Sequence, residues 1–120
     1  MPGNAYNVLL RKHIMTKLLV VVSSADKAKI NVALAFSKNQ KAAGHDVRLI
    51  FFGPSEAMVA KDQELAASVK DAFPDEKPRA CVFVAENSGV KVELEKIAEL
   101  VKAGQYITGS IDEGYSTISF

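Results

Sequence analysis

The apolar residues of the N-terminal half fall into two short runs, and each run predicts a strand. Residues 17–23 start with a lysine and continue as five apolar residues in succession, which is typical of a central strand buried on both faces. Residues 46–52 alternate at first and then become wholly apolar before a turn sequence at 53–55. Glycine, proline and serine in that turn end the second strand.

Helical spacing follows each of these strands. The first helix is predicted to run to about Ala43 and to stop at Gly44. Its predicted cap is Ser24 or Asp26, and its predicted inner face is Ile30, Ala33, Leu34 and Ser37. A second helix is predicted from Pro54 to the residue before Pro74, because apolar residues recur every four positions at Leu65, Val69 and Phe73.

The C-terminal half gives a third strand, a helix and two closing strands. The third strand begins at Arg79 and runs to about Val84, unless the segment from Cys81 instead starts a short helix closed by Gly89. Residues 92–103 have one apolar and one charged face, which predicts a helix. Residues 105–109 and 115–120 are predicted as closing strands joined by a turn at 112–114.

Alternation of strands and helices predicts the fold class. It indicates an α/β protein, a three-layer α/β/α sandwich with a mainly parallel sheet of about five strands. Ligands of such sheets bind beyond the carboxyl ends of the strands. The segments expected to meet there are Ser23 with Ser24, the turn of Gly53, Pro54 and Ser55, and Cys81 with its successors.

Composition narrows the possible partners. A chain of 120 residues has room for one domain with a real core. Fifteen Lys and Arg against fourteen Asp and Glu give a net charge of +1, which offers no field to attract nucleic acid. One cysteine and two distant histidines, His13 and His45, exclude an internal disulfide and make structural zinc implausible. We therefore expect a small molecule or another protein as partner and no metal or organic cofactor.

The sequence carries no pattern of membrane insertion or secretion. Its run from Leu18 to Val22 is five residues long, far short of a membrane span. Basic residues follow a short apolar patch near the start, the reverse of a secretory signal. We expect a cytoplasmic protein in which residues 16–120 form a single domain. Residues 1–15 are interpreted as a leader, either from an upstream start codon or an arm for oligomerisation.

Motifs for common enzyme classes do not occur in the sequence. It contains neither of the glycine-rich phosphate-binding patterns and no G-x-S-x-G sequence, which argues against dinucleotide enzymes, P-loop enzymes and serine hydrolases. Ser23 and Ser24 at a helix start either cap the helix or bind an anion through backbone N–H groups. His45 follows Gly44 at the opposite edge of the sheet, where a solvated histidine is expected.

Cys81 is the residue whose chemistry can carry a reaction by itself, and two interpretations of it stay open. If the third strand stops near Ala80, the thiol lies at a helix N-terminus beside Arg79, where thiolate is favoured. If the strand continues through Val82, Phe83 and Val84, Cys81 is an inert core residue. A redox sensor that uses a Cys81 sulfenate would need a resolving cysteine from a partner.

Several sequence blocks resemble the DsrE-like family over nearly all of residues 16–120. They are the run Lys17 to Ser24, the block Phe51 to Glu56, Ala80-Cys81 with Gly89 eight positions later, and Glu113-Gly114-Tyr115. The DsrE, DsrF and TusD group consists of single α/β domains that commonly form trimers or hexamers. In its best understood branches, one cysteine after the third strand carries sulfur as a persulfide.

The resemblance implies a sulfur carrier with Cys81 as the carrier residue. Ser23, Ser24, Gly53, Pro54 and Ser55 would shape its pocket, and donor and acceptor proteins would be its partners. The alternative is a non-catalytic oligomeric binding module with a structural cysteine. We expect a trimer or a hexamer, both from the family and from aromatic residues left over in the closing strands, namely Tyr106, Tyr115 and Phe120.

Overall fold

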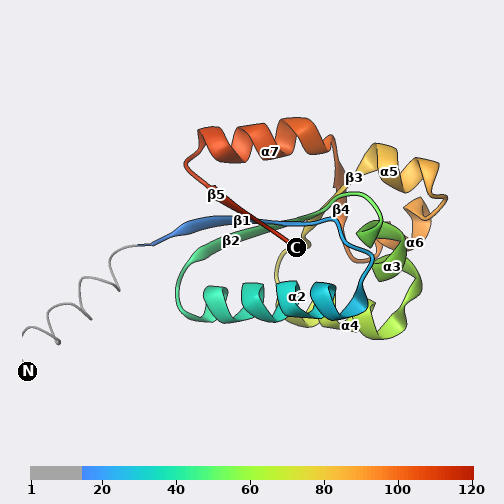
Figure 1. The fold of residues 1–120 in the computed structure, drawn as a ribbon, viewed down its shortest axis with the longest axis horizontal. Helices are drawn as coiled ribbons and strands as arrows, with labels where there is room; N and C mark the ends of the chain where they lie inside the picture. Colours follow the sequence, from blue (N-terminus) through green and yellow to red (C-terminus); the bar gives the residue numbers. More distant parts are fainter. Residues whose placement is uncertain (1–14) are drawn as a thin grey trace, which may run out of the picture.

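Five strands form one sheet in residues 15–120, the part of the chain that the structure, a computed structural model, describes (Figure 1). The strands are β1 (Lys17–Val22), β2 (Asp46–Phe51), β3 (Arg79–Cys81), β4 (Glu99–Val101) and β5 (Ser116–Ser119). The helices are α2 (Lys27–Ala42), α3 (Ser55–Lys61), α4 (Gln63–Ala72), α5 (Val82–Asn87), α6 (Lys91–Glu95) and α7 (Ala103–Asp112). The leader predicted for residues 1–15 lies, apart from Met15, outside the described residues.

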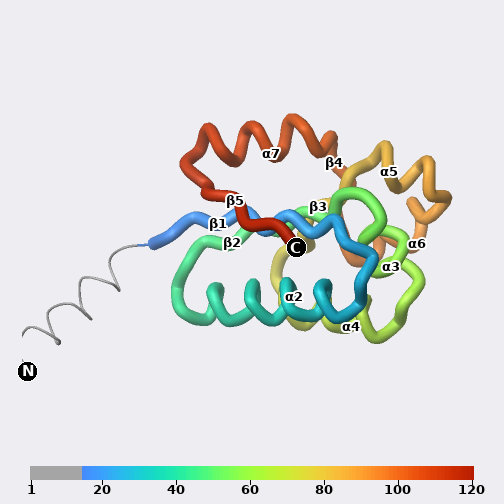
Figure 2. The backbone as a smooth tube through the Cα atoms, in the orientation of Figure 1, coloured from blue at the N-terminus to red at the C-terminus, as the bar shows by residue number. Residues whose placement is uncertain are grey.

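The sheet has the order β4-β3-β2-β1-β5, and all neighbouring strands are parallel. Figure 1 shows α7 on one face of the sheet, α2 and α4 on the other, and α3, α5 and α6 toward the carboxyl ends of the strands. The tube in Figure 2 follows the chain through α7 from β4 at one edge to β5 at the other. The predicted three-layer α/β/α sandwich with five parallel strands is confirmed.

The larger core lies between the sheet and the face covered by α2 and α4. There α2 buries the face that the sequence predicts, Ile30, Ala33, Leu34 and Ser37. Its cap is Asp26, whose carboxylate accepts hydrogen bonds from the backbone N–H groups of Ala28 at 2.8 Å and Lys29 at 3.2 Å. This carboxylate satisfies N–H groups that have no partner within the helix.

A smaller core lies between the sheet and α7. Successive strand residues point to opposite faces, so Leu19 and Ile50 face α7 while their neighbours Val20 and Phe51 join the larger core. The smaller cluster consists of Leu19, Ile50, Cys81, Ala103 and Tyr115. The cysteine singled out by the sequence is therefore part of the core beneath α7.

The single helix predicted from Pro54 to Phe73 is two helices, so that prediction is wrong at Asp62. Asp62 has an extended conformation, φ −95° and ψ 113°, and ends α3. Its carboxylate accepts a hydrogen bond from the Leu65 amide at 3.0 Å and so caps α4. An aspartate can cap a new helix in this way, which makes a break stable within an otherwise helical pattern.

Two predictions in the C-terminal third are also wrong. The helix expected over residues 92–103 is replaced by α6, which ends at Glu95, and by β4. The strand expected over residues 105–109 lies inside α7. The second closing strand, predicted over 115–120, is confirmed as β5.

The aromatic residues expected to be left over for oligomerisation have partners within the chain. Tyr115 is buried, and Tyr106 packs against the cluster beneath α7. The Phe120 ring lies 5.9 Å from that of Phe36 in α2. These side chains thus lend no support to an oligomer. Among the described residues, none of the helices has the length and apolar character needed to cross a membrane.

Candidate functional site

Cys81 stands at the junction between β3 and α5. It is the last residue of the strand and the residue before the first turn of the helix, with φ −73° and ψ 121°. The interpretation in which a short helix starts at Cys81 and closes at Gly89 is the correct one, since α5 ends at Asn87. This junction brings Cys81 to the carboxyl edge of the sheet, as predicted.

The Cys81 side chain points into the core beneath α7 and not out of the sheet edge. It is 5% exposed. It belongs to the smaller cluster with Leu19 and Ile50, and Val84 and Ile107 are packed against that cluster. Apolar neighbours of this kind are typical of a structural cysteine.

Glu56 is a buried acid beside the Cys81 backbone. Its side chain is 0% exposed, and its Oε2 accepts a hydrogen bond from the Gly53 amide at 3.3 Å. Its Oε1 has no hydrogen-bond partner within residues 15–120. Burial raises the pKa of Glu56 to about 7, although the backbone N–H groups of Gly53 and Cys81 act in the opposite direction. Glu56 is thus a buried acid in the turn after β2, held by one hydrogen bond within that turn.

The serine and glycine residues predicted to shape a pocket form a closed set of turns. Ser55 Oγ donates to the Val22 carbonyl at 2.6 Å, and the Ser55 amide donates to the Ser23 carbonyl at 3.1 Å. Ser24 Oγ accepts from the Asp26 amide at 3.0 Å. Pro54 lies beside them as an exposed residue. These residues meet at the predicted edge, but the hydroxyls of Ser24 and Ser55 already have partners there, and the Cys81 thiol faces the core beneath α7.

We predict that Gly53→Ala destabilises the protein by about 1–2 kcal/mol, because Gly53 has φ +94°, a left-handed conformation unfavourable for L side chains. The cost is conformational, since an added Cβ would lie 3.9 Å from the Ser23 carbonyl oxygen. The matched control is Gly109→Ala in α7, where a Cβ meets nothing within 4 Å and a gain of about 0.5–1 kcal/mol is expected. Urea unfolding measures the stability change of both variants. Stability changes of the same sign in the two variants would contradict the prediction.

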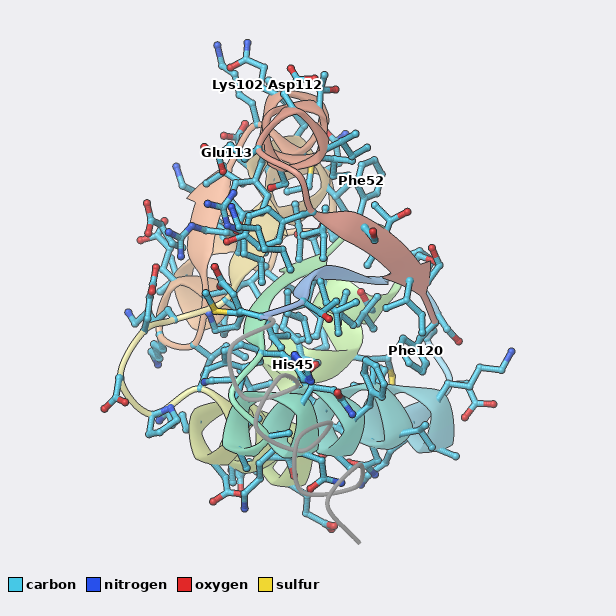
Figure 3. All side chains as sticks on the ribbon, turned by 90° about the vertical axis from the view of Figure 1, so that its left-hand side faces the viewer. His45, Phe52, Lys102, Asp112, Glu113 and Phe120 are labelled. Atoms are coloured by element: carbon cyan, nitrogen blue, oxygen red, sulfur yellow. The ribbon has the colours of Figure 1, made fainter. Side chains whose placement is uncertain are left out.

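A pocket of about 720 Å³ opens at the amino-terminal edge of the sheet, opposite the edge where the sequence predicts a site. It lies between the α7 face of β2 and β3 and the C-terminal part of α7. Figure 3 views the molecule from this side, with Glu113 beside α7 and His45 toward α2. His45 lies at this edge, as expected, half-buried in the pocket wall, and its Nδ1 accepts a hydrogen bond from the Thr16 amide at 3.1 Å.

Two arginines on adjacent strands line this pocket. Arg48 Nη1 donates to Ser110 Oγ at 3.0 Å and pairs with Glu113 at 2.6 Å. Arg79 pairs through Nη2 with Glu76, three positions earlier in the chain, at 3.1 Å, and through Nη1 with Glu99 at 3.5 Å. Parity along the strands places Arg48 on the same face as Ile50, and Arg79 on the same face as Cys81.

Two tyrosines separate the pocket from the core beneath α7. The Arg48 guanidinium lies 4.1 Å from the ring centroid of Tyr115, and the Tyr106 ring centroid lies 5.7 Å from the Arg79 guanidinium. Tyr115 Oη donates to Asp46, and burial together with this bond raises its pKa to about 12. Burial also raises the pKa of Tyr106. Both phenols therefore stay neutral donors at physiological pH.

The pocket and the Cys81 cluster lie on the two sides of the same pair of tyrosines. Tyr106 and Tyr115 line the pocket and also pack in the cluster that contains the thiol. Cys81 is two residues beyond Arg79 on the same face of β3, a separation of about 7 Å along a strand. Cys81 itself is not among the residues that line this pocket, which sequence reasoning missed.

The comparisons with known proteins bear on the fold. No protein-family model matches the chain, and no curated protein does. Among solved structures, a conserved protein of unknown function from Bacteroides thetaiotaomicron superposes with a TM-score of 0.75 at 20% sequence identity. The match covers 87% of this chain and 95% of that one. The two proteins share a fold, and at this identity the likeness extends no further.

Proposed function

We propose that the chain is a DsrE-like sulfur carrier that holds a persulfide on Cys81. The observation that carries the proposal is the position of this cysteine at a strand-to-helix junction, on the face of β3 that leads to an arginine-lined pocket. Support for the family comes from the resemblance of the sequence and from the confirmed three-layer fold.

The proposed reaction is thiol exchange in two steps. The Cys81 thiolate attacks the terminal sulfur of a donor persulfide, the sulfur–sulfur bond of the donor breaks, and the donor leaves as a thiolate. Cys81 then bears the persulfide. In the second step an acceptor thiolate attacks the terminal sulfur and releases the Cys81 thiolate, so no external oxidant or reductant is needed.

The proposal includes donor and acceptor proteins as partners, a cytoplasmic location and assembly as a trimer or hexamer. In this proposal, a set of turns holds the junction at Cys81 in place. These turns contain Ser23, Ser24, Gly53, Pro54 and Ser55. Sedimentation at micromolar concentration tests the assembly, and a monomer would contradict it.

The burial of the Cys81 thiol favours a second candidate function. Cys81 is 5% exposed among apolar residues, as expected of a non-catalytic oligomeric binding module in which the cysteine belongs to the core. The two candidates differ in how the thiol becomes accessible. A carrier needs a local opening beneath α7, whereas a structural cysteine reacts only when the whole domain unfolds.

We expect iodoacetamide to alkylate Cys81 in the native protein about 10 to 100 times more slowly than in the denatured chain. This ratio corresponds to a local opening of about 1.4 to 2.7 kcal/mol, below the free energy of global unfolding. The rate, read by intact mass, should change little at low urea concentrations, because a local opening exposes little surface.

The matched control is Ser37→Cys in a Cys81→Ala background. Ser37 is 0% exposed on the α2 side of the sheet, so a thiol there should react only through global unfolding and its rate should rise steeply with urea. If Cys81 shows the same steep dependence, the sulfur-carrier proposal fails and the binding module is supported.

A further inference from the structure

The arginine-lined pocket has hydrogen-bonding capacity that the chain does not use. A guanidinium has five N–H donors. The hydrogen bond and the ion pair of Arg48 both use Nη1, while its Nη2 and Nε have no partner within residues 15–120. Arg79 donates from Nη1 to the Lys77 carbonyl at 2.7 Å and from Nη2 to Glu76 at 3.1 Å. Donors therefore remain free on each guanidinium at the pocket wall.

The carboxylates that pair with these arginines are exposed and replaceable. The side chains of Glu113, Glu76 and Glu99 are 57%, 78% and 61% exposed, against 31% for Arg48 and 20% for Arg79. Exposed ion pairs contribute little stability, since water solvates the carboxylate equally well. Each glutamate can turn into solvent without leaving a buried charge.

The arginines themselves are held in place. Arg48 stacks over the Tyr115 ring at 4.1 Å and bonds to Ser110, which is fully buried. The Tyr106 ring has Arg48 at 5.8 Å and Arg79 at 5.7 Å from its centroid. Guanidinium groups fixed on aromatic rings lose little side-chain freedom when they bind an anion.

The two guanidiniums can act on one small ligand. Arg79 pairs in register with Ile50, so Arg48 lies one strand across and two residues back. Strand spacing and rise place the two Cα atoms about 8 Å apart. Lys41 and Lys77 also line the pocket, with their ammonium groups bonded to the Ala72 and Glu95 carbonyls. Carboxylate and phosphate groups both accept paired N–H bonds from arginine.

We propose that this pocket binds a small oxyanion, a carboxylate or a phosphate, between Arg48 and Arg79 in place of the glutamates Glu113 and Glu76. The proposal goes beyond sulfur transfer and does not depend on it, because none of these groups takes part in the chemistry at Cys81. Carboxylate and phosphate share the recognition chemistry, and separate probes distinguish them.

This proposal is tested by isothermal titration calorimetry of the full chain at low ionic strength. The probes are citrate and inorganic phosphate. Arg48→Gln should weaken binding about tenfold or more, because it removes charge-assisted hydrogen bonds. Glu113→Gln should tighten binding about two- to fivefold, because it removes a competing carboxylate. Lys70→Gln, an exposed change in α4 on the far side of the sheet, should leave binding unchanged.

Each outcome decides the proposal. Binding of citrate alone identifies a carboxylate ligand, and binding of phosphate alone identifies a phosphate ligand. Absence of binding for both probes at millimolar concentration overturns the proposal, as does equal weakening by Lys70→Gln and Arg48→Gln. Glu113 is exposed, so its variant folds even if Arg48→Gln does not, and failure of Glu113→Gln to tighten binding also overturns the proposal.

Discussion

The free energy of unfolding of the wild-type protein is expected to fall by about 3 kcal/mol between pH 4.5 and about pH 7. The Glu56→Gln variant should not show this fall. Glu56 is fully buried and its pKa is raised to about 7, chiefly by burial. In the unfolded chain the same carboxyl ionises near 4.5. The folded state thus holds this proton over a range in which the unfolded chain has released it.

The sign follows from proton binding. Below pH 4.5 both states are protonated, and the full contribution of the buried acid is present. As pH rises toward 7, the unfolded state binds fewer protons than the folded state, so the free energy of unfolding falls. Above about pH 7 both states are ionised and the loss is complete. Glutamine stays neutral throughout and shows none of this loss.

Urea unfolding across this pH range measures the effect as the difference between wild type and variant. Glu86→Gln is the matched control, since Glu86 is exposed in α5 and its replacement should leave the pH dependence intact. A difference between wild type and Glu56→Gln that stays constant with pH would show that the Glu56 carboxyl titrates normally.

The N-terminal half of the fold could be predicted because its patterns are unambiguous. The apolar run of β1 is too short for a helix and has no polar face, and α2 buries the four positions that its spacing singles out. In such segments the pattern of buried apolar residues alone determines whether a strand or a helix forms. The order of strands and helices then led correctly to a parallel three-layer sheet.

The predictions for the C-terminal third were wrong because short segments there fit both the helical and the strand spacing of apolar residues. Ile97, Ala98 and Val101 match a helical face, yet residues 99–101 pair with β3 as strand β4. Residues 105–109 hold β-branched and aromatic residues between glycines, which resembles a strand. The spacing of Ala103, Tyr106, Ile107 and Ser110 fits one helical face, and this signal was available in the sequence.

The candidate site was predictable only at Cys81. Its position after the third strand follows from the pattern, but the direction of its side chain depends on strand parity and on α7, which the sequence analysis placed wrongly. A glutamate in a first helical turn is usually a solvated partner of the helix dipole, so nothing marked Glu56 as buried. Strand parity could have placed Arg48 and Arg79 on the face of Ile50 and Cys81.

Replacement of Cys81 is expected to abolish sulfur uptake completely. The chain has one cysteine, and thiol exchange requires a thiolate that attacks the donor sulfur. Alanine is the better replacement because Cys81 lies among apolar residues. Serine would bury a hydroxyl there at a cost of about 1–3 kcal/mol, so its stability must be compared first.

Two controls separate carrier chemistry from the mere presence of a thiol. Cys81→Ala should fold with nearly wild-type stability and take up no sulfur. The Ser37→Cys, Cys81→Ala protein restores one fully buried thiol on the opposite side of the sheet, and it should also take up none. Uptake by that protein would mean that any cysteine in this domain reacts.

The most direct test of the central claim is the intact mass of the native protein after incubation with glutathione persulfide. The account predicts that wild type gains one sulfur atom, that an excess of thiol removes it, and that Cys81→Ala gains none. Wild type that gains no sulfur in the folded state, while its denatured chain is readily alkylated, would contradict the account and leave Cys81 as a structural residue.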